Sequence, residues 1–277
     1  NDPAWSDEFR QVSGHEFALQ VAGVGNFYAR DGEVVEYTPV PGADPEWVTL
    51  YLNGQMLVAL LHQRKIINFH ASSFIFNKRG IMVLGETGAG KSSLTAAFTL
   101  TGAGFLSDDL TPVIFRKAKP QIWPVIRAIK LSEDTVRQLN IDATMLTMAE
   151  AGTGKQYLHV THAGVEDFPL KTILKIETGD CMKPEIREPS PAEKFSLLRS
   201  EICSWEMLAG MPETEAEYLH QLLEILQQTE MVKVVRPAEI EISVLYEVVR
   251  DVLDKSEGER ALRNDPVDHF SEQTDSA

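Results

Sequence analysis

Alternating apolar and polar positions open the chain and predict a run of short antiparallel strands. Apolar side chains recur at every second position over much of residues 14–40, and an Asp31-Gly32 pair interrupts them as in a hairpin turn. Beyond a Pro-Gly break, the pattern predicts a helix over about residues 45–63, with Asp44 as its N-cap and a proline at its first position. We expect residues 1–65 to form strands and one helix that pack on the rest of the chain.

The middle of the chain changes to continuous apolar runs. Residues 66–76 and 81–84 predict two successive strands, the second of them buried on both faces. A helix follows over about residues 91–100, and further strands begin at Phe105 and Pro112. This alternation predicts an α/β fold with a mostly buried, partly parallel sheet. We expect the antiparallel N-terminal strands to extend that sheet.

Beyond residue 120 the pattern is weaker, although most elements still have recognisable ends. We expect strands at about 122–130, 170–177 and 232–235, helices at about 132–139, 190–203, 213–228 and 243–253, and a mobile loop at 151–167. The core unit would then span residues 66–254. Residues 255–277 are charged and almost lack aliphatic side chains, which predicts a disordered tail.

Charge and composition argue against two classes of partner. The chain has 26 Lys and Arg against 41 Asp and Glu, a net charge of −15 that repels the phosphate backbone of nucleic acids. Its apolar stretches are far shorter than the roughly 20 residues of a membrane span. Cys181 and Cys203 lack zinc-type spacing and are typical of buried thiols in a reducing compartment. We therefore expect a cytoplasmic protein that binds neither nucleic acid nor membrane.

A glycine-rich segment between the strand at 81–84 and the helix at 91–100 carries the strongest chemical signal. It reads Gly85-Glu86-Thr87-Gly88-Ala89-Gly90-Lys91-Ser92, followed by Ser93, and it matches the phosphate-binding pattern G-x-x-x-x-G-K-[ST] at each fixed position. Glycine allows successive N–H groups to turn toward phosphate, and the helix N-terminus adds partial positive charge. We expect Lys91 to contact the β- and γ-phosphates and Ser92 to ligate Mg²⁺.

Two adjacent carboxylates, Asp108 and Asp109, end the strand that begins at Phe105. In a doubly wound sheet that strand end lies beside the phosphates. Adjacent strand residues point to opposite sides, so the two carboxylates should have different roles. One would act on the metal through water, and the other would take the proton of an acceptor hydroxyl. The alternative is that the pair merely caps the strand or holds the metal alone.

Together with His70, on the strand before the loop, this spacing resembles that of the HPr serine kinase/phosphorylase family over about residues 64–117. The resemblance implies a P-loop kinase core similar to that of phosphoenolpyruvate carboxykinases, using ATP and Mg²⁺. It implies that Asp109 accepts the proton of the attacking serine, that Asp108 and Ser92 serve the metal, and that His70 and Lys91 complete the catalytic group. It also implies self-association into a homo-oligomer.

The sequence departs from that family in two segments. In place of the family's Glu-x-Arg-Gly-Leu-Gly, residues 123–130 read Trp-Pro-Val-Ile-Arg-Ala-Ile-Lys and lack the metal-binding Glu. The family's Arg-Pro-Gly-Arg-Asn segment has no recognisable counterpart; residues 168–171 are the nearest by position. These departures argue against phosphorolysis and against HPr as acceptor. The whole chain looks more like a branch similar to lasso-peptide tailoring kinases, which phosphorylate a C-terminal serine of a precursor peptide; Val21–Gly25, Leu60–Arg64 and the Trp-Pro segment suggest this branch.

Three basic residues are candidate contacts of phosphate or substrate. Arg127 and Lys130 lie where positive charge would face the transferring phosphate, or else they are the solvated end of a strand. Lys155 ends a second glycine-containing stretch, which lacks the length and the buried lead-in strand of a phosphate loop. It predicts a flexible loop, with the alternative that Lys155 reaches the substrate or the γ-phosphate.

These features predict an Mg²⁺-dependent serine kinase that transfers the γ-phosphoryl group of ATP to a serine hydroxyl of a peptide or protein. Two alternatives stay open. A small-molecule acceptor would require a deep, closed pocket, whereas an open groove beside Asp109 would favour a peptide. A nucleotide-binding sensor would bind ATP without transferring phosphate.

Overall fold

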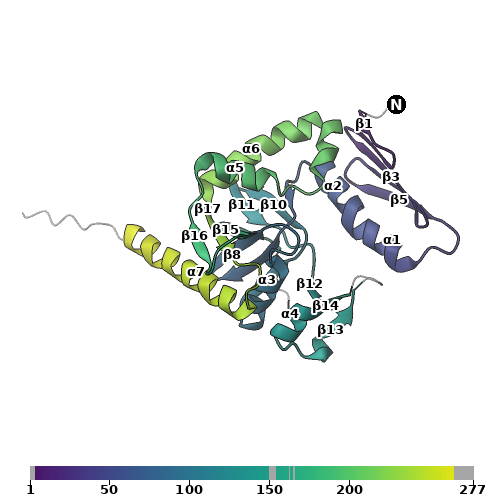
Figure 1. Cartoon of the computed structure of the whole chain (residues 1–277). Helices are drawn as coiled ribbons and strands as arrows, with labels where there is room; N and C mark the ends of the chain where they lie inside the picture. The colour runs from purple at the N-terminus through teal and green to yellow at the C-terminus, as the bar shows by residue number, and fades with distance from the viewer. Residues whose placement is uncertain (1–3, 150–153, 162, 165, 265–277) are drawn as a thin grey trace, which may run out of the picture.

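The computed structural model describes residues 4–149, 154–161, 163–164 and 166–264. It contains three β-sheets, with helices packed between and around them (Figure 1). In the described residues, no helix combines the length and the apolar character that crossing a membrane requires. The mixed α/β class predicted from the sequence is confirmed, since one sheet holds both parallel and antiparallel pairs.

The N-terminal strands form a sheet of their own, in chain order: β1 (Trp5–Ser6), β2 (Arg10–Ser13), β3 (Glu16–Val21), β4 (Gly25–Arg30) and β5 (Val34–Pro39). The prediction that they extend the central sheet is therefore wrong. One face of this sheet buries Phe17 and Phe27 against Met56 and Met207. Because this face has its own apolar cover, the strands form a separate two-layer unit beside the core (Figure 1).

The predicted helix over residues 45–63 is present, but it is interrupted. It consists of α1 (Pro45–Tyr51), a π-helical turn η1 (Leu52–Met56) and α2 (Leu57–Gln63). The Asp44 carboxylate caps the start and accepts a hydrogen bond from the Glu46 N–H at 2.9 Å. Single π-turns within helices often occur at functional sites.

The central sheet has the order β6-β10-β11-β15-β8-β7-β9, and β17 pairs with β15 and with β16. Its strands are β6 (Asn68–Phe69), β7 (Ser72–Phe76), β8 (Arg79–Leu84), β9 (Gly104–Ser107), β10 (Thr111–Arg116), β11 (Lys119–Ile122), β15 (Phe168–Thr178), β16 (Glu185–Arg187) and β17 (Glu230–Arg236). The single strand predicted at 66–76 is split into β6 and β7, because its two halves pair with different neighbours: β6 with β10, and β7 with β8 and β9.

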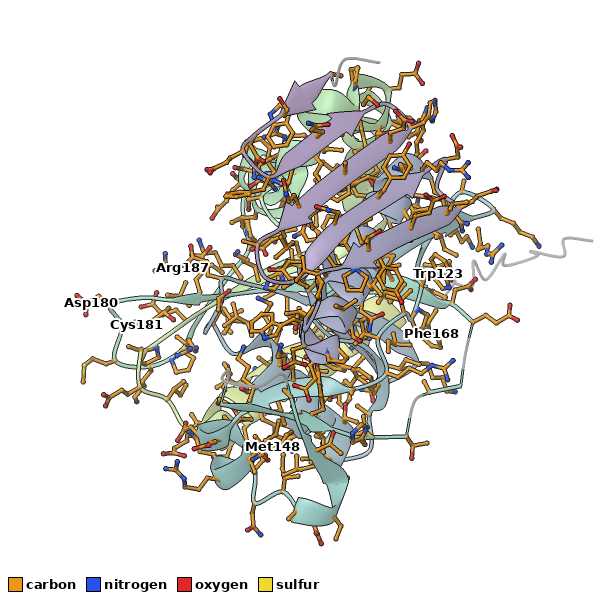
Figure 2. All side chains as sticks on the ribbon, turned by 90° about the vertical axis from the view of Figure 1, so that its right-hand side faces the viewer. Trp123, Met148, Phe168, Asp180, Cys181 and Arg187 are labelled. Carbon is orange, nitrogen blue, oxygen red and sulfur yellow. The ribbon has the colours of Figure 1, made fainter. Side chains whose placement is uncertain are left out.

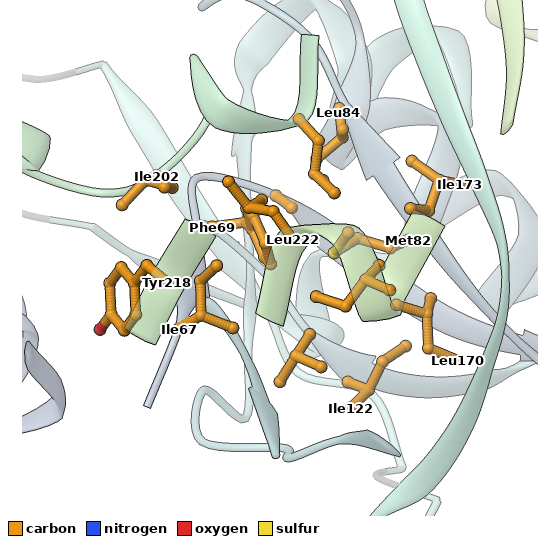
Figure 3. Close-up of a cluster of buried hydrophobic side chains, with 14 of the residues drawn as sticks. Ile67, Phe69, Met82, Leu84, Ile122, Leu170, Ile173, Ile202, Tyr218 and Leu222 are labelled. Atoms are coloured by element: carbon orange, nitrogen blue, oxygen red, sulfur yellow. The ribbon is translucent and has the colours of Figure 1, made fainter. Parts of the chain in front are cut away.

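Helices cover both faces of the central sheet. On one face, α3 (Lys91–Leu100) packs with α7 (Ile242–Asn264) around Phe98. On the other face, α5 (Pro191–Arg199) and α6 (Pro212–Gln228) pack their apolar side chains, among them Leu198 and Leu222, against strand residues such as Met82 (Figure 3). The short helix η3 (Trp205–Gly210) lies between them in sequence.

The C-terminal helix is longer than the sequence analysis expected. Its backbone continues through residues 255–264, which had been expected to belong to a disordered tail, and residues 265–277 lie outside the described part. The cause is local. The segment is rich in Glu, Arg, Lys, Ala and Leu, which are good helix formers, and it follows turns already nucleated by the buried Leu245 and Leu253.

A third, small sheet differs from the expectation for residues 120–167. It comprises β12 (Ile129–Ser132), β14 (Lys155–Leu158) and β13 (Leu146–Met148), next to α4 (Glu133–Gln138) and η2 (Ala143–Met145). The strand predicted at 122–130 is therefore wrong: β11 ends at Ile122, and β12 begins only at Ile129, beyond Pro124. The loop predicted at 151–167 contains β14, which pairs with both other strands; residues 150–153, 162 and 165 lie outside the description.

Candidate active site

The phosphate-binding loop connects the buried strand β8 to helix α3, in the context that the sequence predicted. Gly88 and Gly90 have left-handed φ angles of 85° and 105°, which L side chains rarely adopt. A Cβ on Gly85 would lie 2.6 Å from the Ile176 carbonyl oxygen of the neighbouring strand. The glycines of the pattern are therefore required both by backbone conformation and by the closeness of β15.

Lys91 begins α3 and folds back over the loop. Its ammonium nitrogen lies 2.5 Å from the Gly85 carbonyl oxygen and 3.4 Å from that of Glu86. Burial lowers the pKa of Lys91, and the carboxylates of Glu201 and Asp109 oppose that effect. The loop carbonyls thus hold the cation where a phosphate group would replace them as its partner.

Arg236, at the end of β17, holds the phosphate-binding loop through hydrogen bonds to its main chain. Its guanidinium donates to the carbonyl oxygens of Ala89 at 2.8 Å and Gly88 at 2.9 Å. The guanidinium also donates to the carbonyl oxygens of Pro237 at 2.7 Å and Ala238 at 2.9 Å. Sequence reasoning missed this residue because nothing around it forms a motif, and strand pairing alone brings it to the loop.

Asp108 lies fully buried beneath the loop. It accepts hydrogen bonds from the Ser72 hydroxyl, from the Ser92 hydroxyl at 2.9 Å and from the Lys130 N–H at 2.9 Å. Burial, together with the charge of Asp109, raises the pKa of Asp108 to about 6, although the three donors partly oppose this shift. The structure therefore joins Ser92 and Asp108, the two residues that the sequence assigned to Mg²⁺.

The donor set fits a hard cation. A serine hydroxyl backed by a carboxylate is the arrangement by which P-loop proteins hold Mg²⁺, whose remaining positions are filled by water and nucleotide oxygens. In the described part of the chain, no three His, Cys, Asp or Glu residues cluster as a metal site. Ser92 would thus be the protein's direct ligand, with Asp108 orienting it.

Asp109 is exposed, in contrast to its buried neighbour Asp108, and both residues lie beyond the end of β9 at Ser107. Its φ angle is 62°, and the Leu110 N–H donates to the Asp108 carbonyl oxygen at 2.8 Å across it. Asp109 is thus the central residue of a tight three-residue turn. Strained backbone of this kind is concentrated at functional sites.

His70 lies between Asp109 and the phosphate loop, at the break between β6 and β7. Burial and the nearby Lys91 lower its pKa, and its side chain bonds to the main chain of Asp109. Its own N–H donates to the Glu201 carbonyl oxygen at 2.7 Å. The histidine therefore links the acidic turn to the segment after α5.

A buried ion pair completes the floor of the site. The Lys175 ammonium of β15 lies 2.5 Å from the Glu201 carboxylate, and the two side chains are only 5% and 9% exposed. Neither residue was among the sequence candidates, since each stands alone in an otherwise unremarkable segment.

His70, Asp108, Asp109 and the ion pair line one cavity of about 1080 Å³, whereas Lys91, Ser92 and Arg236 are not part of its lining. Its lining includes residues 85–87 of the loop, His70, Asp109 and the ion pair, together with residues of α1, of the π-turn and of the segment 200–204 that contains Glu201. Met148, exposed on the small sheet, lies at its rim (Figure 2). The cavity is therefore bounded by all three parts of the fold.

Of the three basic residues predicted to contact phosphate or substrate, one lines the cavity and two do not. Lys130 lines the cavity, with its ammonium 5.8 Å from the centre of the Tyr157 ring, and its main chain also holds Asp108. Arg127 is exposed and is not part of the lining. Lys155 is half-buried at the start of β14 and also lies outside the lining.

Of the comparisons with known proteins, the one with solved structures found a match. No family model and no curated protein matches the sequence. Among solved structures, the chain matches that of the HPr(Ser) kinase/phosphatase from Coxiella burnetii, at 15% identity and a TM-score of 0.38, over 74% of this chain and 98% of that one. The resemblance is distant, so the function is inferred from the chemistry of the site itself.

Proposed function

We propose that this chain is a kinase that transfers the γ-phosphoryl group of ATP to a serine hydroxyl of a peptide or protein, with Mg²⁺. The observation that carries the proposal is the joint placing of three groups. Residues 85–87 of the phosphate loop, the Asp108 carboxylate that accepts from Ser92, and the exposed Asp109 line one cavity. A simple nucleotide-binding sensor has no need for the third group.

Each group has a separate task in phosphoryl transfer. The loop N–H groups and Lys91 would bind the phosphates, and Ser92, oriented by Asp108, would hold the cation. When bound, Mg²⁺ neutralises charge on the phosphate oxygens and aligns them. Little covalent chemistry is left to the protein, so positioning and electrostatics carry most of the rate.

The transfer itself requires a proton acceptor. The serine oxygen forms a bond to the γ-phosphorus while the bond from that phosphorus to the β–γ bridging oxygen breaks, and ADP leaves with the electron pair. The hydroxyl proton passes to the Asp109 carboxylate. Positioned bases of this kind contribute roughly 10²–10⁴-fold to rate. His70 keeps the turn that carries Asp109 in place through its bond to the main chain.

The cavity has room for an acceptor beside the nucleotide. Its volume of about 1080 Å³ exceeds the roughly 300–1,000 Å³ typical of a site for one small ligand. Residues of α1 and of the segment 200–204 also line it and could contact an acceptor. The acceptor class includes a C-terminal serine, as the sequence resemblance to lasso-peptide tailoring kinases implies.

The test is a transfer assay with Mg-ATP and a panel of serine-containing peptides, some of which end in serine. Mass spectrometry would detect the gain of one phosphoryl group. Asp109→Asn should lower the rate by roughly 10²–10⁴-fold while retaining ATP binding. Asp180→Asn is the matched control, because Asp180 is equally exposed but lies in the loop before β16, away from the cavity (Figure 2).

The outcomes separate the alternatives. Transfer by the wild type and by Asp180→Asn, with loss in Asp109→Asn, supports the kinase. ATP binding without transfer to any peptide contradicts it and favours a small-molecule acceptor or a sensor. Transfer that persists in Asp109→Asn removes that residue as the base.

A further inference from the structure

The buried ion pair between Lys175 and Glu201 has no part in the mechanism above, yet both side chains line the active-site cavity. Burying two charges costs desolvation energy that their mutual attraction roughly offsets, so such pairs add little to stability. A pair of this kind at a catalytic cavity therefore calls for a functional explanation.

The position of Lys175 is set by the sheet. β15 runs parallel to β8, and Lys175 stands in register with Leu84, the residue that precedes Gly85. The ammonium therefore lies at the foot of the phosphate loop. Lys175 and Glu201 both act electrostatically on Lys91, in opposite directions. The two lysines thus belong to one electrostatic cluster around the phosphate site.

We propose that Lys175 is a second phosphate-binding cation, which exchanges Glu201 for the terminal phosphate of a bound nucleoside triphosphate. This inference rests on the proposed binding of nucleotide at the loop. The terminal phosphate is assigned because Lys175 faces the cavity that also holds Asp109, where the transferring group must lie to reach the base. The loop amides and Lys91 would bind the β- and γ-phosphates at the same time.

The exchange needs only a side-chain movement. The main chain around Glu201 is tied to the strand beside it, since the His70 N–H donates to the Glu201 carbonyl oxygen at 2.7 Å and the Cys203 N–H to that of Asn68 at 3.1 Å. Glu201 keeps the buried lysine neutralised until phosphate arrives. Because the terminal phosphate carries more negative charge than one carboxylate, it is the stronger partner for the ammonium.

The test compares the binding of two nucleotides to the full chain by calorimetry: Mg²⁺ with ADP, and Mg²⁺ with the non-hydrolysable triphosphate AMPPNP. Lys175→Met should weaken AMPPNP binding about tenfold or more, because a charge-assisted hydrogen bond is lost. ADP binding should change less than about twofold. Lys119→Met is the matched control, since Lys119 is exposed on β11 and away from the cavity.

A second variant serves as a control for misfolding, because Lys175→Met leaves the Glu201 carboxylate buried without its partner. The double variant Lys175→Met with Glu201→Gln removes both charges and should show the same selective loss. Glu201→Gln alone should tighten AMPPNP binding, since it removes the competing anion. In every sample, ADP binding reports whether the loop is intact.

An equal loss of affinity for both nucleotides, or no loss for either, overturns the inference. These results are separate from the kinase assay. A wild type that binds AMPPNP but phosphorylates no peptide contradicts the proposed reaction, while the affinity ratio still decides the role of Lys175. A wild type that binds neither nucleotide contradicts both.

Discussion

Two non-glycine residues of the cavity lining, Asp109 and Ser204, have a left-handed backbone conformation. Their φ angles are 62° and 44°, and both line the cavity. L side chains tolerate this region poorly, because the Cβ approaches the backbone. At the residue scale, then, local strain coincides with the position that the chemistry requires. Asp109 is also exposed, so packing does not compensate for the strain.

This strain leads to a prediction that separates stability from activity. Asp109→Gly should be more stable than Asp109→Ala by about 1 kcal/mol, because glycine adopts a left-handed φ without a Cβ penalty. Both variants lack the carboxylate, so both should lose phosphoryl transfer. Urea denaturation of the two variants measures the difference. Equal stabilities would show that the turn at Asp109 is not strained.

At the scale of the element, segments distant in sequence are held against the site by single side chains. Arg236 at the end of β17 bonds to the phosphate loop. His62, on α2, bonds through Nε2 to the Cys203 carbonyl oxygen and lies 2.9 Å from the Tyr218 hydroxyl through Nδ1. His62 thereby joins the N-terminal helix to α6 and to the segment that carries Glu201.

His62 predicts a dependence of stability on pH. It is fully buried, and burial lowers its pKa from 6.5 to about 4. Because the folded state then binds a proton less readily than the unfolded state, the stabilisation is present above pH 6.5 and is lost as the pH falls toward 4. The loss would reach about 3 kcal/mol.

The measurement is the free energy of unfolding of the wild type and of His62→Gln between those two pH values. His62→Gln should be less stable at neutral pH, where it loses packing and hydrogen bonds. Its stability should fall less steeply with acid than that of the wild type. Parallel curves for the two proteins would mean that His62 does not remain neutral in the folded state.

At the scale of the whole molecule, three parts of the fold meet around the cavity. The N-terminal unit supplies α1 and the π-turn, the central sheet supplies the loop and the carboxylates, and the small sheet supplies Lys130. In the proposed function the nucleotide binds at the loop, and the acceptor binds against the residues that the N-terminal unit contributes. A change in those N-terminal residues should therefore act on acceptor binding alone.

A substitution of Gln55 tests whether nucleotide binding and acceptor binding depend on different residues of the cavity. It lies in the π-turn, lines the cavity and donates to the Ser204 hydroxyl at 3.3 Å. Gln55→Ala should raise KM for the peptide acceptor several-fold, in keeping with the loss of about 1 kcal/mol for one hydrogen bond. KM for ATP should be unchanged. A rise in KM for ATP, or none for the peptide, would contradict the assignment of these residues to the acceptor.

Local features of the fold and of the site were predictable from the sequence, because they depend on neighbouring residues. The phosphate loop is one continuous segment, and its glycines, lysine and serine are defined by mutual spacing. Helix caps such as Asp44 and Ser190 follow from single side chains that bond within two or three residues. The different environments of Asp108 and Asp109 were also predicted, although they arise from the turn that follows β9 and not from strand alternation.

Only the tertiary structure decided which distant segments complete the site. Lys175, Glu201 and Arg236 carry no motif, and the pairing of β15 with β8 and of β17 with β15 brings two of them to the loop. The separate N-terminal sheet was likewise not predictable, since an apolar strand face does not specify which surface will cover it. Spacing along the chain determines sites that are built from neighbouring residues, such as the phosphate loop. Contacts between distant residues depend on strand order and packing, which a sequence pattern alone does not specify.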